Sequence, residues 1–462
     1  MRETVDQIMR IAQRWKPDQV EAYWSRNKVT TIRMALNDIV EAKTMDIEGA
    51  SIRFVLNKSI GFASTTDLSD EGLTKMVEAS FKAAKSKSSD PDFHSLPETT
   101  KVRPLQAPDK MLLELELSEA VKLGYDALGT ARAEGRGLDF SGAINVVSEE
   151  CAVMNSLGVD VTDMTAFVFS SFTVEESEER SAISQDCSRT LKGFDPSKTA
   201  KEAIGSIRQT KGGITVQPGT YDIIFGPHAC AELVEYVLSY GLDLSAVDSG
   251  ISYYREKLGD VVSIKEFTVL DDGRHPEGIA SKSSDDEGVP TGTTPLIEDG
   301  ILRNFLTDSY YAAKMSSLVR SFKSTGNGFR FGPVPGRDYS SLPRVQPTNI
   351  VIKPGDWSLE EMIRETRRGI LIGRIWYSYP INPTVGEFST TNRGDTYYIE
   401  NGEVRSSIVP NTFRVNDQLP RLLKHIQGLT KEQTQSVVWA GVSSCISPHI
   451  KFSDVKITYS KE

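Results

Sequence analysis

A segment rich in glycine and proline crosses from the first half of the chain to the second. This crossing limits the possible folds more than any other feature of the sequence. Its sequence is KGGITVQPGTYD, over residues 211–222. Glycine and proline interrupt helices and strands, and a chain of 462 residues is too long for one ordinary core. We therefore predict an α+β protein of two domains. The first is an α+β domain with antiparallel strands over residues 1–210, and the second is a β-rich, barrel-like domain over residues 211–462.

Local signals before the crossing alternate between helix and strand. Apolar residues at three-four spacing predict a helix within residues 1–15, and Ser69 before two acidic residues predicts a capped helix. The segment SIRFVLNKSIGFAST predicts a hairpin that turns at Asn57-Lys58, and a longer β ribbon is predicted to turn at residues 155–158. Hairpins of this kind make antiparallel sheets.

Past the crossing, short strand-like segments separated by turns dominate. Asp299-Gly300 and Asn401-Gly402 are typical hairpin turns. Ser358 with Glu361 three residues on predicts a capping box at the start of a helix that ends near Gly369. The acidic run at residues 285–287 is predicted to be an exposed turn, because carboxylates are usually solvated.

Charge and cysteine content narrow the class of protein. The net charge is −10 and the pI about 5.3, which argues against direct binding to nucleic acid or to an anionic membrane surface. No apolar run approaches the ~18 residues of a membrane span, and the N-terminus lacks the apolar core of a signal peptide. Four scattered cysteines without CxxC spacing predict no disulfide framework, and we expect a reducing cytoplasm.

One segment in the second domain has the composition of a metal-binding helix, YDIIFGPHACAELVEYVLSYGL over residues 221–242. If Pro227 is the first helical residue, then His228, Glu232, Glu235 and Ser239 follow one another at offsets of four, three and four. They therefore share one face of the predicted helix.

Two interpretations of this face remain open. A histidine and a glutamate four residues apart could chelate a divalent metal, with Glu235 as a base toward bound water and Cys445 or His449 as distant ligands. Alternatively, the face is simply the solvated or interface side of an amphipathic helix, and Cys445 is a small buried apolar residue in a strand. No GxSxG, P-loop or dinucleotide-binding glycine motif occurs in the sequence.

Several stretches together resemble the TldD/PmbA (TldE) family, which is also labelled "modulator of DNA gyrase". They are IGFASTTDLSDEGL (60–73), the Asn155–Gly158 turn, DDEGVPTGTTPLIEDGILRNFLTD (285–308), STGNGFR (324–330), PTNIVIKPGDWSLEEMI (347–363) and NPTVGEFSTTNRGDTYYIENGEV (382–404). The resemblance implies a two-domain subunit that dimerises around an enclosed substrate channel. It also implies a peptidase that acts on unfolded peptides.

The family has two branches, and the resemblance places this chain in one of them. The TldD branch binds zinc through a His-Glu-xxx-His helix and a cysteine near the C-terminus, whereas the PmbA/TldE branch lacks this motif and pairs with TldD. On that pattern the motif falls on residues 231–236, where Glu232 is retained but Ala231 and Tyr236 replace both histidines. Neither replacement supplies an imidazole to zinc.

We therefore expect a PmbA/TldE-like subunit with no catalytic residue, metal ligand or cofactor of its own. Its partner would be a TldD-like, zinc-bearing subunit, or a second copy of itself in a homodimer. Two alternatives remain. One is an independent zinc metallopeptidase whose shifted site uses His228, Glu232, Cys445 and His449, with Glu232 and Glu235 as catalytic groups. The other is a protein-binding modulator of DNA gyrase.

Overall fold

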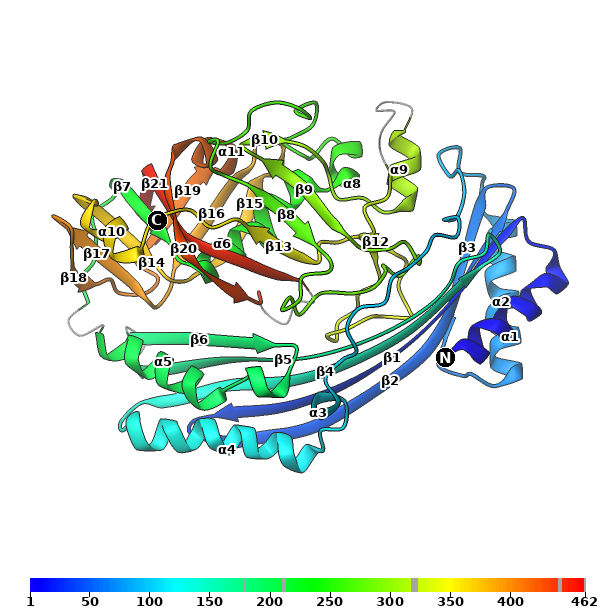
Figure 1. The fold of residues 1–462 in the computed structure, drawn as a ribbon, viewed down its shortest axis with the longest axis horizontal. Helices are drawn as coiled ribbons and strands as arrows, with labels where there is room; N and C mark the ends of the chain where they lie inside the picture. The colour runs from blue at the N-terminus through cyan, green and yellow to red at the C-terminus, as the bar shows by residue number, and fades with distance from the viewer. Residues whose placement is uncertain (178–179, 210–212, 317–322, 439–442, 461–462) are drawn as a thin grey trace.

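The computed structural model describes residues 1–177, 180–209, 213–316, 323–438 and 443–460. Two large sheets organise this part of the chain, and the long strands of the first curve beneath the second (Figure 1). No described helix combines the length and the apolar composition that crossing a bilayer requires.

The first sheet has six antiparallel strands in the order β3-β2-β1-β4-β5-β6. Its strands are β1 (Gln19–Ala35), β2 (Asp38–Leu56), β3 (Ser59–Thr65), β4 (Asp139–Asn155), β5 (Asp160–Ser177) and β6 (Arg180–Ser188). The predicted hairpin turn at Asn57-Lys58 is confirmed, and both residues adopt positive φ, at 50° and 61°. The ribbon that turns at residues 155–158 is confirmed as β4 and β5.

Helices cover the side of this sheet that faces away from the second sheet (Figure 1). They are α1 (Arg2–Ala12), α2 (Asp70–Ser86), α3 (Lys110–Leu113), α4 (Leu117–Glu134) and α5 (Pro196–Gln209). The predicted cap of α2 is confirmed, because the Ser69 hydroxyl accepts a hydrogen bond from the Gly72 N–H. Leu73 and Val77 of this helix are buried against Phe54 of β2.

Helix α2 lies so close to β3 that Gly61 has no room for a side chain. A methyl group at Gly61 would stand 1.9 Å from the Ser80 carbonyl oxygen and 2.6 Å from the Ala84 nitrogen, both in the helix backbone. We expect Gly61→Ala to lower the free energy of unfolding by about 1–3 kcal/mol, because the helix must move off the sheet.

Guanidinium-induced unfolding measures this loss, and α4 supplies a matched control. Gly129 is exposed and has no atom within 4 Å of the methyl position. Gly129→Ala should therefore raise stability by about 0.5–1 kcal/mol through helix propensity. Equal effects of the two substitutions would contradict the close packing at Gly61.

The second sheet has thirteen strands of mixed direction. Its main path is β10-β9-β8-β13-β21-β7-β14-β17-β18, while β20 and β19 also pair with β21, and β16 and then β15 follow β19. The strands are β7 (Gly219–Phe225), β8 (Val269–Asp272), β9 (Thr293–Glu298), β10 (Ile301–Leu302), β13 (Asn349–Ile352), β14 (Arg368–Ile372), β15 (Ile375–Asn382), β16 (Glu387–Asn392), β17 (Thr396–Glu400), β18 (Glu403–Ser407), β19 (Phe413–Gln418), β20 (Ile426–Ser436) and β21 (Ser444–Tyr459).

These strands confirm the predicted class, an α+β protein with an antiparallel N-terminal sheet and a β-rich C-terminal part. The pairs β13–β21 and β7–β14 are parallel and the other pairs of this sheet are antiparallel. The described strands branch at β21 and do not close on themselves, so "barrel-like" fits only loosely. A separate pair is formed by β11 (Gly328–Phe329) and β12 (Arg344–Val345).

Short helices connect the strands of the second sheet. They are α6 (Pro227–Leu233), a π-helical turn (Val234–Leu238), α7 (Ser239–Leu242), α8 (Leu244–Asp248), α9 (Ser309–Met315), α10 (Leu359–Arg364) and α11 (Leu419–Leu422). The predicted capping box of Ser358 and Glu361 is confirmed. The predicted end of that helix near Gly369 is wrong, because α10 ends at Arg364, and Gly369 lies in β14, where it pairs with Asp222 of β7.

The predicted exposure of the acidic run 285–287 is also wrong. Asp285 and Asp286 are 0% exposed and Glu287 is 2% exposed. Each carboxylate has its own donors: Asp285 accepts the Gly328 N–H at 2.9 Å, Asp286 accepts the Tyr23 hydroxyl at 2.9 Å, and Glu287 pairs with Arg53 at 3.0 Å. Burial is tolerated because these charges are paired or hydrogen-bonded.

Further buried ion pairs lie beside this acidic run, between the two sheets. Glu21 of β1 pairs with both Arg53 and Arg330, and Glu149 of β4 pairs with Lys282. We call this set the inter-sheet charge cluster: Glu21, Tyr23, Arg53, Glu149, Asp163, Lys282, Asp286, Glu287, Arg330 and Arg337. It connects strands of the first sheet to loops of the second half, and so it fixes how the two sheets sit together.

Candidate functional site

Helix α6, the predicted metal-binding helix, begins where β7 ends. Gly226 donates its N–H to the Ile372 carbonyl of β14 at 2.9 Å, and Pro227 occupies the first turn as predicted. The helix packs against β21, β20 and β15. After Leu233 it continues as a π-helical turn over Val234–Leu238, so the regular spacing on which the sequence prediction depended is broken within this segment.

The polar residues of this helix are largely buried rather than solvated. Glu232 is 4% exposed. His228 Nδ1, Glu232 Oε2 and Ser239 Oγ are buried, and none has a hydrogen-bond partner among the described residues. The interpretation of the face as solvated is therefore wrong for Glu232, because β15 and the residue before it cover that side of α6. Buried polar atoms without partners are rare and often mark functional positions.

A buried arginine that the sequence did not single out shares this neighbourhood. Arg374 lies directly before β15, and its Nη1 is likewise buried with no partner among the described residues. Burial raises the pKa of Glu232 to about 7, against the attraction of the Arg374 guanidinium and a hydrogen bond from Ser378. Burial, with repulsion by Arg374 and His449, lowers the pKa of His228 to about 4. The imidazole is therefore neutral near pH 7.

Two of the remaining predicted donors, Glu235 and Cys445, form a second neighbourhood. Glu235 accepts a hydrogen bond from the Ser443 hydroxyl at 2.9 Å, and burial raises its pKa. Cys445 of β21 is buried in the hydrophobic core of the second sheet, as its strand-like context predicts. Burial raises the pKa of the Cys445 thiol well above its usual range, and the nearby Cys230 and Glu235 add to the shift.

The geometry of β21 explains why the predicted ligands of the shifted metal site fall into two separate groups. Cys445 and His449 are four residues apart on one strand, which separates their backbones by about 13 Å. His449 therefore lies near His228 and Gly226, whereas Cys445 lies near Glu235. Two ligands of one zinc ion must approach within a few ångströms of each other.

The residues present do not match the donor set that zinc requires. Within the described ranges, no group of three or more His, Cys, Asp or Glu side chains is arranged to hold a metal ion. Ala231 is buried, and burial beside Glu232 and Glu235 raises the pKa of Tyr236 to about 12. The phenol of Tyr236 is thus neutral and no substitute for an imidazole.

Strand β15 presents an exposed row beside the helix. Tyr377, Tyr379 and Ile381 are 49%, 54% and 60% exposed, while the intervening Ser378 is buried and its hydroxyl hydrogen-bonds to that of Thr390 at 2.8 Å. Among the described strands β15 pairs with β16 alone, so no described strand occupies its other edge. An open edge with exposed aromatic residues can accept an extended peptide as an added strand.

Comparison with known proteins identifies a metallopeptidase-like protein and specifies its family. Models described as "PmbA/TldA metallopeptidase C-terminal domain" and "PmbA/TldA metallopeptidase domain 1" match residues 218–459 and 20–84. The first match alone spans more than half of the sequence. The chain belongs to the PmbA/TldD family, as the sequence motifs predict.

Solved structures and curated relatives agree with this assignment. TldE from Thermococcus kodakarensis is 27% identical, with a TM-score of 0.89 over 98% of this chain and 100% of that one. A Thermotoga maritima protein with the provisional name modulator of a DNA gyrase shares the fold, at 21% identity and a TM-score of 0.85 over 99% of each chain. The metalloprotease TldD homolog of Buchnera aphidicola subsp. Acyrthosiphon pisum is 25% identical over 386 residues, covering 79% of this chain and 76% of the relative.

Proposed function

We propose that this protein is a PmbA/TldE-like subunit of a peptidase complex and that a TldD-like partner supplies the zinc. The proposal depends mainly on the sequence: by the resemblance to the family, Ala231 and Tyr236 fall at the positions where the zinc-binding branch has histidines. Glu232 is retained, but it faces the guanidinium of Arg374. A fixed positive charge thus lies near the carboxylate that the catalytic branch places beside its metal.

The substrate class follows from strand β15. The edge that no described strand occupies and the row of exposed aromatic residues suit an unfolded peptide bound through its main chain, which requires no particular sequence. The proposed role is therefore to form part of the chamber and to hold extended peptides. All four cysteines, each within the described residues, are free thiols, which suits the proposed location in a reducing cytoplasm.

Co-expression with a family member that carries the His-Glu-xxx-His motif tests this role. We expect a stable heteromer that hydrolyses an unstructured peptide, and no hydrolysis by this chain alone. A chelator should abolish the activity, because the zinc is in the partner. Replacing the motif glutamate of the partner by glutamine should abolish it too, whereas Glu232→Gln in this chain should leave kcat unchanged. Cleavage of reporter peptides by the purified proteins provides the measurement.

A different outcome would favour the second candidate, an independent zinc metallopeptidase. The buried and unpartnered Nδ1 of His228 and Oε2 of Glu232 are the observation in its favour. If the isolated chain, as a homodimer, contained stoichiometric zinc and lost its hydrolysis upon Glu232→Gln, the subunit role would be wrong.

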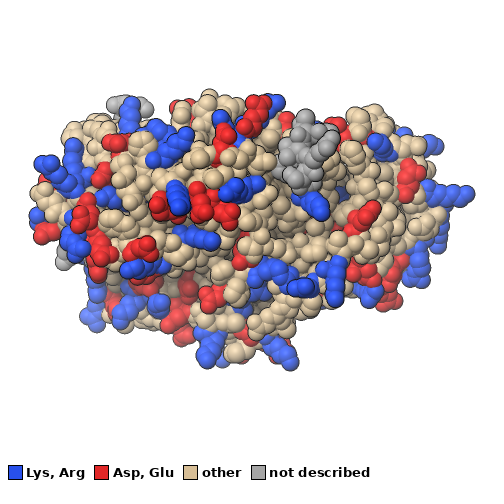
Figure 2. All heavy atoms as spheres, turned by 45° about the horizontal axis from the view of Figure 1, so that its top comes forward, with Lys and Arg blue, Asp and Glu red and all other residues tan. Residues whose placement is uncertain are grey.

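A protein-binding modulator of DNA gyrase is the third candidate, supported by the provisional name of the Thermotoga maritima relative. Lysine and arginine are interspersed with aspartate and glutamate over the face in Figure 2, so direct binding to nucleic acid is not part of the proposal. Gyrase captured by this chain in the absence of any peptidase partner would support this candidate.

A further inference from the structure

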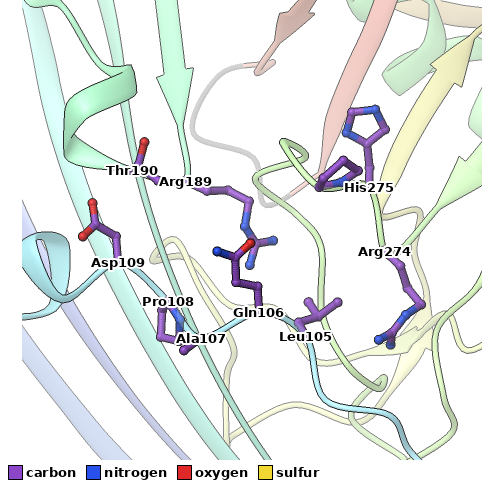
Figure 3. Close-up of a pocket in the computed structure, with 10 residues that line it drawn as sticks. Leu105, Gln106, Ala107, Pro108, Asp109, Arg189, Thr190, Arg274 and His275 are labelled. Atoms are coloured by element: carbon purple, nitrogen blue, oxygen red, sulfur yellow. The ribbon is translucent and has the colours of Figure 1, made fainter.

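A cavity of about 400 Å³ lies where three separate segments meet, away from helix α6. Its walls come from the strap at residues 105–109, from the residues after β6, and from the loop after β8 (Figure 3). The volume lies within the range of small-molecule sites. None of the contacts described for the proposed peptidase role involves this cavity.

Arg189, which follows β6, reaches the centre of the cavity (Figure 3). Its Nη1 donates to the carbonyls of Gly278 at 3.0 Å and Ser281 at 3.1 Å, which fixes the side chain without neutralising it. The carboxylates that attract it, Asp163 and Glu149, are already paired with other cations of the inter-sheet charge cluster. Its Nε and Nη2 have no partner among the described residues, so they are available to a ligand.

Arg274 and His275 stand on one side of the cavity (Figure 3). Arg274 donates to the carbonyls of Arg103 at 3.0 Å and Pro104 at 3.1 Å, so it is held to the strap by neutral acceptors. In the described part of the chain it makes no ion pair. His275 Nδ1 accepts the Glu277 N–H at 3.3 Å, which leaves its Nε2 without a described partner.

The charge balance of the walls selects the kind of anion. Asp109, on the opposite side from Arg274 in Figure 3, is the one carboxylate among the lining residues, and its oxygens accept the N–H groups of Met111 and Leu191. Two guanidinium groups against one carboxylate leave about one positive charge. That balance suits a monoanion such as a carboxylate better than a phosphate dianion. Guanidinium groups bind carboxylates through strong, directional hydrogen bonds.

We infer that this cavity binds the C-terminal carboxylate of a peptide, with Leu105, Pro108 and Pro276 against its last side chain. The choice of a peptide rests on the proposed function, whereas the preference for a carboxylate rests on the cavity alone. Binding here would hold one end of an unfolded chain at a site that no residue of helix α6 lines.

Fluorescence anisotropy of the isolated chain tests the inference without any peptidase partner. The probes are two fluorescein-labelled octapeptides of alternating glycine and serine that end in leucine, one with a free carboxylate and one with a carboxamide. We expect the free acid to bind at least about tenfold more tightly. Arg189→Gln and Arg274→Gln should each bring this ratio close to one, while Arg303→Gln, a surface arginine of the same half, should leave it unchanged.

Two further measurements keep the result decisive. Arg189→Lys keeps the charge but loses the planar donor pair, so it should retain part of the preference even if Arg189→Gln does not fold. Propionate should displace the acid probe at lower concentration than inorganic phosphate. Equal binding of acid and amide, an unchanged ratio in the Arg189→Gln/Arg274→Gln double variant, or stronger competition by phosphate would overturn the assignment. Loss of the proposed heteromer would leave all of these results unaffected.

Discussion

Replacing Arg330 with alanine should lower the free energy of unfolding by about 3–5 kcal/mol, because it removes one of the two cations that pair with a fully buried carboxylate. Arg330 is 0% exposed and pairs with Glu21, which is equally buried. Its Nη1 also donates to the Ser51 hydroxyl at 3.1 Å and to the Ser341 carbonyl at 3.0 Å. The guanidinium lies 4.3 Å from the centre of the Tyr23 ring. Alanine removes all of these contacts together.

Unfolding by guanidinium, followed by tryptophan fluorescence, measures the loss. Arg303→Ala is the matched control, because that arginine pairs with Glu298 at the surface, where both side chains are more than 40% exposed. An exposed pair contributes about 0–1 kcal/mol. A loss at Arg330 no larger than at Arg303 would show that the inter-sheet charge cluster does not hold the two sheets together.

The same cluster shows which features of the fold could not be predicted from the sequence. Local signals predicted the hairpin at Asn57-Lys58 and the Ser69 cap, because a turn or a cap depends on neighbours within a few residues. The exposure of the acidic run 285–287 was predicted wrongly for the opposite reason. The ion pair between Arg53 and Glu287 joins residues 234 positions apart. No local pattern distinguishes such a buried, paired carboxylate from a solvated one.

The candidate site was predicted in part. The position of helix α6 and the start at Pro227 follow from the strand, glycine and proline before it. The π-helical turn, which packs against β15, is not indicated by any local signal in the sequence. Arg374 was missed as well. Nothing in its local sequence separates it from other arginines, and only the pairing of distant strands brings it to Glu232.

Replacing Glu232 with glutamine should raise stability by an amount that grows with pH, to about 3 kcal/mol above pH 7. Burial raises the pKa of Glu232 from 4.5 to about 7, so between these values the folded protein binds a proton that the unfolded chain has lost. The stability that this carboxyl contributes is fully present below pH 4.5, and it is lost as the pH rises through about 7. Glutamine cannot ionise, so the variant does not undergo this loss.

The difference in unfolding free energy between Glu232→Gln and the natural protein, measured from pH 4.5 to 8, isolates this carboxyl. His228, whose pKa is lowered to about 4, contributes equally to both proteins and cancels in the difference. Glu71→Gln, at a side chain that is 77% exposed, should show no such trend. If Glu232 instead held a metal ion, glutamine would weaken that bond and destabilise the protein most where the carboxylate is ionised. A difference that falls between pH 5 and pH 8 would therefore contradict the proposal that this chain has no zinc site at Glu232.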